Sequence, residues 1–99
     1  MTYRVRIRRP AEADIQQAED WYDEQRPGLG VDFRSEVISL LYRLGDTPLI
    51  HEQAYGEVRR APVRRFPFLV WYRVSGDNAQ VLACSHCRQH PGAVFQRFR

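Results

Sequence analysis

The chain has 99 residues, of which 43% are hydrophobic and 27% charged, and this balance predicts one globular domain spanning residues 1–99 rather than a disordered chain. Its formal net charge is only +3, although fifteen basic residues, all of them arginine, oppose twelve acidic ones. No stretch approaches the roughly 20 apolar residues of a membrane helix, and the N-terminus lacks the apolar segment of a signal peptide, so we expect a cytoplasmic protein without membrane contact.

The first predicted element is a strand over residues 3–8. Apolar residues alternate there with arginines from Tyr3 to Arg8, and this period of two predicts a half-buried strand with a basic outer face. Pro10 ends the strand and opens a helix, because proline at the first helical position loses no hydrogen bond. Apolar residues continue at helical spacing until Arg26-Pro27-Gly28 ends this helix.

A second helix is predicted from about Gly30 to the turn at residues 45–48. Its apolar residues recur three and four positions apart from Phe33 to Leu44, which indicates one buried face. Only a few residues separate the two helices, so they are expected to form an antiparallel hairpin. Neither helix is apolar all round, and each therefore needs another layer to pack against.

The pattern then changes to strands. Residues 58–65 form an arginine-rich strand, in which Pro62 argues against full pairing as an interior strand. Residues 66–74 place apolar side chains on both faces of the expected strand. This is typical of a central strand that is covered on both sides. A turn at residues 75–78 leads into the last strand, residues 80–88. This order predicts an α+β fold: an N-terminal strand, an antiparallel helical hairpin and a three-stranded antiparallel sheet.

The charges are divided along the chain. Residues 10–57 hold three arginines and eleven acidic residues, a balance of −8, whereas the remaining residues hold twelve arginines and only Asp77, a balance of +11. Codon usage can explain the absence of lysine but not this clustering. Guanidinium groups suit phosphates and carboxylates, so the strand half is predicted to bind nucleic acid or an acidic protein, the alternative being an ordinary solvated sheet face. The arginines in question are Arg4, Arg6, Arg8, Arg59, Arg60, Arg64, Arg65, Arg73, Arg88, Arg97 and Arg99.

Four segments of the sequence carry a resemblance to a known family. They are residues 21–30 (WYDEQRPGLG), residues 58–61 (VRRA), residues 65–74 (RFPFLVWYRV), and His86-x-Arg88 followed by Pro91. These segments resemble the RelE/ParE superfamily of toxins. The resemblance covers nearly the whole chain, with the same order of elements. It implies the toxin of a type II toxin–antitoxin system, which arrests growth until a cognate antitoxin neutralises it.

The two branches of this superfamily act on different targets. RelE-like members are ribosome-dependent mRNA endonucleases, whereas ParE-like members inhibit DNA gyrase. RNA cleavage requires groups that accept and donate protons, with cations around the phosphate, and RelE-like members carry an arginine and a tyrosine where this chain has Leu69 and Phe95. These departures favour the ParE-like branch: inhibition, without catalysis, of a DNA-handling target such as DNA gyrase.

Two alternatives stay open. The first is a RelE-like mRNA endonuclease working on the ribosome, with Arg60, Arg64, His86 and Arg88 as its candidate catalytic residues. The second is a non-toxic module that only binds an antitoxin. In every case we expect an acidic antitoxin that wraps the sheet and the helical hairpin with a helix and an added strand. The residues predicted to bind the target or the antitoxin are Arg59, Arg60, Arg64, Arg65, Arg73, His86, Arg88 and Arg97.

The last predicted strand also carries a histidine–arginine pair and two cysteines. His86 and Arg88 would point to one face, roughly 7 Å apart, and could hold a phosphate or carboxylate; the alternative is a strand-end histidine bonded to the backbone. In a strand, Cys84 and Cys87 would lie on opposite faces about 10 Å apart, too far for a disulfide. One C-x-x-C is only half of a zinc site. We therefore expect Cys84 in the core, Cys87 as a free thiol, and neither metal nor cofactor.

Overall fold

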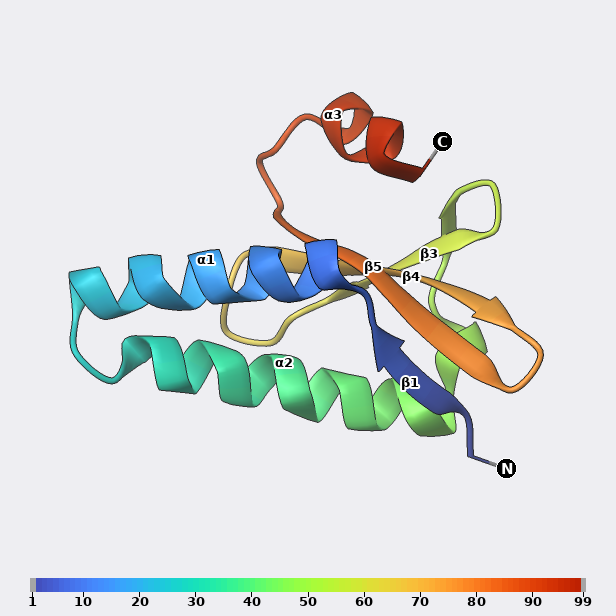
Figure 1. The fold of residues 1–99 in the computed structure, drawn as a ribbon, viewed down its shortest axis with the longest axis horizontal. Coiled ribbons are helices and arrows are strands. Elements are labelled where there is room, and N and C mark those ends of the chain that lie inside the picture. Colours follow the sequence, from blue (N-terminus) through green and yellow to red (C-terminus); the bar gives the residue numbers. More distant parts are fainter. Residues whose placement is uncertain (1, 99) are drawn as a thin grey trace.

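The structure, a computed structural model, describes residues 2–98 and confirms the predicted α+β fold (Figure 1). Two long helices follow the first strand, and a short third helix lies near the C-terminus. No helix in the described part is both long and apolar enough to span a bilayer. The elements are β1 (Arg4–Ile7), α1 (Arg9–Gln25), α2 (Leu29–Asp46), β2 (Gln53–Tyr55), β3 (Val58–Pro62), β4 (Phe68–Ser75), β5 (Asn78–His86) and α3 (Pro91–Phe95), with single 3-10 turns η1 (Pro48–Ile50) and η2 (Gln96–Phe98).

All strands join one five-stranded sheet in the order β1-β5-β4-β3-β2. β1 pairs parallel to β5, and every other neighbouring pair is antiparallel. The three strands predicted after the helices are present, but the structure adds the short β2, which the sequence pattern did not reveal. Pro62 ends β3 opposite Leu69 of β4, beyond the last residue paired with β2, so the proline removes no interior hydrogen bond.

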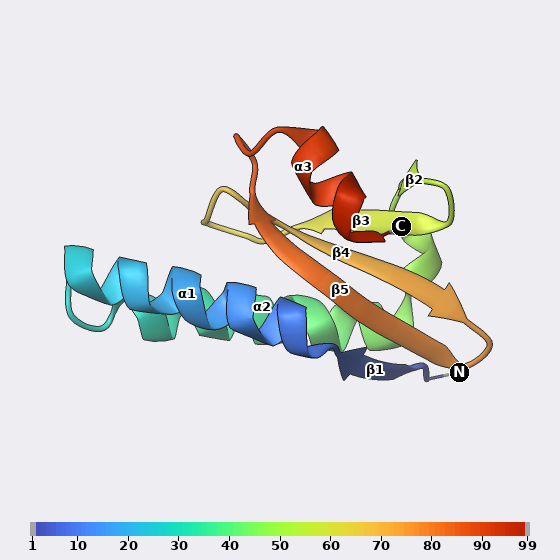
Figure 2. The same ribbon diagram turned by 45° about the horizontal axis from the view of Figure 1, so that its top comes forward.

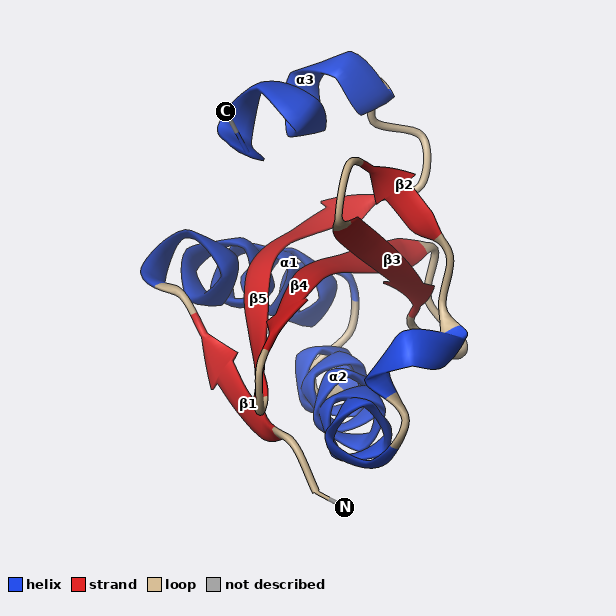
Figure 3. Cartoon of the chain, turned by 90° about the vertical axis from the view of Figure 1, so that its right-hand side faces the viewer, coloured by secondary structure: helices blue, strands red, loops and turns tan. Residues whose placement is uncertain are grey.

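The helical hairpin covers one face of the sheet (Figures 1 and 3). Gly28 makes its tight connection, with a φ of 91° in the left-handed region that favours glycine. The buried faces of both helices meet Val70, Tyr72 and Val81 on β4 and β5 in a single apolar cluster. The helices contribute Ala11, Ile15, Ala18, Tyr22, Phe33, Val37, Leu40 and Leu44 to this cluster.

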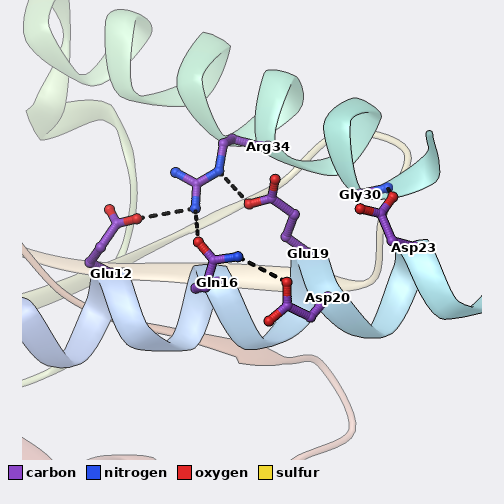
Figure 4. Close-up of polar contacts among 7 residues, drawn as sticks. All are labelled: Glu12, Gln16, Glu19, Asp20, Asp23, Gly30 and Arg34. Carbon is purple, nitrogen blue, oxygen red and sulfur yellow. Dashed lines mark hydrogen bonds and ion pairs between the residues drawn. The ribbon is translucent and has the colours of Figure 1, made fainter. Parts of the chain in front are cut away.

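Polar contacts hold the two helices together along their exposed edge (Figure 4). The guanidinium of Arg34 on α2 donates hydrogen bonds to Glu19, and to Glu12 at 3.1 Å, both on α1. At the connection, the Asp23 carboxylate accepts the Gly30 N–H at 2.8 Å. Part of the acidic charge of the hairpin therefore serves the packing of its two helices.

The C-terminal tail covers the centre of the opposite face (Figure 2). Trp71 is 2% exposed and its indole N–H donates to the Ser85 hydroxyl at 2.8 Å. The rings of Phe95 and Phe98 pack against it, with centroids 5.7 and 5.8 Å away, and Val94 is buried beneath them. The prediction that the strand over residues 66–74 is covered on both faces is thus confirmed, and the second cover is the helical tail, α3 and η2.

The close approach of the helices at Gly30 gives a stability prediction. An added Cβ there would lie 2.8 Å from the Asp23 carboxylate and closer still to the Glu19 carbonyl. We expect Gly30→Ala to lower the free energy of unfolding by about 1–3 kcal/mol in urea denaturation. In the same helix, Gly45→Ala is the control, since its Cβ meets only ordinary contacts at 3.6 and 3.7 Å and alanine gains up to about 1 kcal/mol in helix propensity. Equal stability of Gly30→Ala and the wild type would contradict this packing.

Candidate functional site

Several predicted binding arginines are engaged by the chain itself. Arg59 donates to the carbonyl oxygens of Leu49 and His51, at 3.2 and 2.7 Å, and so braces the segment between α2 and β2. Arg60 pairs with Glu52 at 2.7 Å and lies over the ring of Trp71, 5.8 Å from its centroid. These two side chains hold the fold together on the β2–β3 side of the sheet.

Two more predicted arginines bridge the basic and acidic halves of the chain. Arg65 pairs with Glu36 of α2 at 3.2 Å. Arg97 of η2 pairs with Asp14 of α1 at 3.0 Å, and the same carboxylate accepts the Cys84 N–H at 2.9 Å. Some of the charges that are separated along the sequence therefore neutralise one another in the folded chain. The basic surface available to a partner is smaller than the number of its arginines implies.

The predicted arrangement of His86 and Arg88 is wrong. β5 ends at His86, and Arg88 lies in the following turn rather than on the same strand face. The Arg88 N–H donates to Nδ1 of His86 at 3.0 Å, so the alternative of a strand-end histidine bonded to the backbone is what the structure shows. The strand stops there because the chain must leave the sheet to bring α3 over its second face.

The four candidate nuclease residues do not meet at one site, although His86 and Arg88 are neighbours at the end of β5. His86 lines a depression of about 700 Å³ beside α1, together with Trp21 and Asp14. Arg64 lines another, of about 470 Å³, near the end of α2. Arg60 is held over Trp71, and neither it nor Arg88 lines either depression. No common centre of proton transfer is formed by these residues.

The two cysteines have different environments. Cys84 is buried in the cluster between sheet and helices, as expected, and burial raises the pKa of its thiol to about 12. Cys87 is exposed in the turn after β5 and is a free thiol. Within residues 2–98, no group of three or more His, Cys, Asp or Glu side chains is placed to hold a metal ion.

A pocket lined by three arginines lies on the sheet face opposite the helical hairpin, between β1 and the C-terminal tail. We call it the arginine pocket; its volume is about 620 Å³, and it is lined by Arg8, Pro10, Arg73, Leu82, Arg97 and Phe98. Arg73 and Arg97 were among the predicted binding residues. Arg8 was predicted only as one of the clustered arginines of the strand half and not among the residues that bind the target or the antitoxin. Arg99, also one of the clustered arginines, is outside the described residues.

A second surface feature is an apolar groove between β1 and α2. β1 is an edge strand of the sheet, and the groove beside it has a volume of about 450 Å³ and is lined by Val5, Ile7, Ile38 and Tyr42 among others. Ile38 is 44% exposed and Tyr42 78% exposed. The exposed edge of the sheet at β1 is therefore accompanied by exposed apolar side chains.

Two comparisons with known proteins bear on the family and the fold. The family model described as the ParE toxin of the type II toxin–antitoxin system parDE matches residues 5–91. The chain belongs to this family. It is the toxin component of a type II toxin–antitoxin system, as the resemblance implied. A search of curated proteins found no match.

Solved structures with the same fold come from both branches of the superfamily. The chromosomal ParDE system of P. aeruginosa matches with a TM-score of 0.77 and 20% identity, over 86% of this chain and 96% of that one. The free E. coli toxin RelE with two arginines replaced matches with a TM-score of 0.71 and 13% identity, over 95% of this chain and 93% of that one. A chain of the RelBE2 toxin–antitoxin complex of Mycobacterium tuberculosis matches with a TM-score of 0.61 and 18% identity, over 87% of this chain and 92% of that one. At these identities the similarity shows the fold alone.

Proposed function

We propose that this ParE-family toxin arrests growth by binding a DNA-handling enzyme such as DNA gyrase, without cleaving RNA, and that a cognate antitoxin neutralises it. The observation that carries the proposal is the dispersal of the candidate nuclease residues. Arg60, Arg64 and His86 lie in different surroundings, whereas a base and an acid that cleave RNA must reach the same phosphate.

The positions of the missing catalytic groups support the same conclusion. The resemblance implies that Leu69 and Phe95 stand where RelE-like members carry an arginine and a tyrosine, and both side chains pack against the apolar cluster around Trp71. Neither side chain can donate a proton or stabilise a charged intermediate. Binding without catalysis needs only a charged and shaped surface, which the arginine pocket and the sheet face around it provide.

The proposed target is tested with purified components. We expect the chain to inhibit ATP-dependent supercoiling by DNA gyrase, and expect primer extension on mRNA from induced cells to show no new cuts. The antitoxin added in equal amount is the control, and it should restore supercoiling. Codon-positioned cuts in mRNA would instead assign the chain to the RelE-like mechanism. Normal growth on induction without the antitoxin would leave only a non-toxic binding module.

We propose that the antitoxin binds along β1 and the groove beside it. An edge strand presents unpaired N–H and C=O groups to which an extended segment can add. Apolar side chains of such a segment can enter the groove at Ile7, Ile38 and Tyr42, while acidic ones can face Arg4 and Arg6, which are exposed on β1. This surface therefore suits a segment in which apolar and acidic residues alternate.

A pair of isoleucine substitutions tests this surface. Ile38→Asp places a charge in the groove, and we expect it to weaken antitoxin binding at least about tenfold, measured by calorimetry. Ile50→Asp is the matched control, since Ile50 is also exposed, at 72%, but lies outside the groove. Equal affinities of the two variants would place the antitoxin elsewhere.

A further inference from the structure

The arginine pocket is assembled from three distant parts of the chain by the sheet pairing. Arg73 of β4 is paired with Gln80 of β5, and Gln80 is paired with Arg6 of β1. Residues in one such row lie on the same face of the sheet, and Arg8 follows Arg6 by two positions. The tail then brings Arg97 across this face. The parallel placement of β1 beside β5 is what joins the arginines of the N-terminal strand to Arg73.

The pocket holds more positive charge than the described residues neutralise. Its lining contains three arginines and no acidic side chain. Arg97 is paired with Asp14 at 3.0 Å, while within residues 2–98 no acidic group lies within ion-pair distance of Arg8 or Arg73. Two guanidinium charges are thus left for a ligand. Pro10 in the lining belongs to the first turn of the 17-residue helix α1, whose positive end also favours an anion.

Charge and shape together select the ligand. A phosphate monoester carries about −1.5 to −2 charges at neutral pH, which matches the two uncompensated arginines, whereas a carboxylate or a phosphodiester carries only one. Guanidinium groups bind phosphate through two parallel hydrogen bonds. Leu82 and Phe98 add an apolar wall, and a volume of about 620 Å³ is within the range that accommodates a small organic ligand.

We propose that the arginine pocket binds a phosphate monoester attached to a nucleoside. The source is either a free nucleoside monophosphate or the phosphorylated end of a nucleic-acid strand. The phosphate lies between Arg8 and Arg73, with Arg97 held in place by Asp14, and the base lies against Phe98. This site is a feature of the fold and does not depend on which cellular target the toxin attacks.

The proposal is tested by calorimetric titration of the purified 99-residue chain with adenosine 5′-monophosphate and with an oligonucleotide that bears a 5′-phosphate. Matched ligands are adenosine, the methyl ester of the monophosphate, and the same oligonucleotide without its terminal phosphate. We expect each monoester to bind at least about tenfold more tightly than its matched ligand. Binding of both monoesters identifies the phosphate alone as the determinant, and binding of only the oligonucleotide identifies a strand end as the source.

Two variants assign the binding to this pocket. Arg73→Gln should weaken monoester binding at least about tenfold, and Arg26→Gln, which removes an exposed arginine outside the pocket, should leave it unchanged. Thermal unfolding of both variants checks that they are folded. The proposal would be overturned if the monoesters and their matched ligands bound with equal affinity, or if both variants lost the same amount of monoester affinity. Full displacement of the monoester by a glutamate-rich peptide would also overturn it.

Discussion

The structure depends on the apolar character of both faces of β4 and β5. These central strands bury Val70, Tyr72 and Val81 on one face and Trp71 and Leu82 on the other. Apolar burial drives folding roughly in proportion to the area removed from water, so a single covering layer is not enough. The helical hairpin covers most of the first face, and the C-terminal tail, which has only one short helix and a 3-10 turn, covers the centre of the second.

The part of the second face that the tail leaves uncovered is the part that carries the arginines of β1 and β4. The tail also contributes Arg97 to it, so the element that completes the core is the same one that closes the arginine pocket. Other arginines pair with acidic residues, as Arg34 and Arg65 do with the helical hairpin. Exposed pairs of this kind contribute about 1 kcal/mol or less each, and their main effect here is to orient the layers. Within residues 2–98 only Arg34, Arg60, Arg65 and Arg97 are in ion pairs, so most of the arginines behind the net charge of +3 stay without an acidic partner in the chain.

The sequence was sufficient to predict what local periodicity determines. The alternation from Tyr3 to Arg8 and the helical spacing from Phe33 to Leu44 located the first strand and the second helix. Prolines, turn residues and apolar runs located the first helix and the later strands. β2 could not be predicted because its three residues have no pattern of their own and it exists only by pairing with β3. The wrong arrangement of His86 and Arg88 has a similar origin, since the end of β5 is set by the path of the tail. Which arginines are paired also depends on partners as distant as Asp14 and Arg97, and spacing along the chain does not reveal such contacts.

The central claim is that the sheet face between β1 and the tail is the working surface of the toxin. The most direct measurement is growth arrest after induction of the Arg8→Gln/Arg73→Gln double variant, compared with Arg26→Gln, in cells without the antitoxin. Antitoxin binding and thermal unfolding of the purified chains serve as checks that the variants are folded. We predict that the double variant is folded, still binds its antitoxin and no longer arrests growth, while Arg26→Gln remains fully toxic. Full toxicity of the folded double variant would contradict this assignment of the working surface.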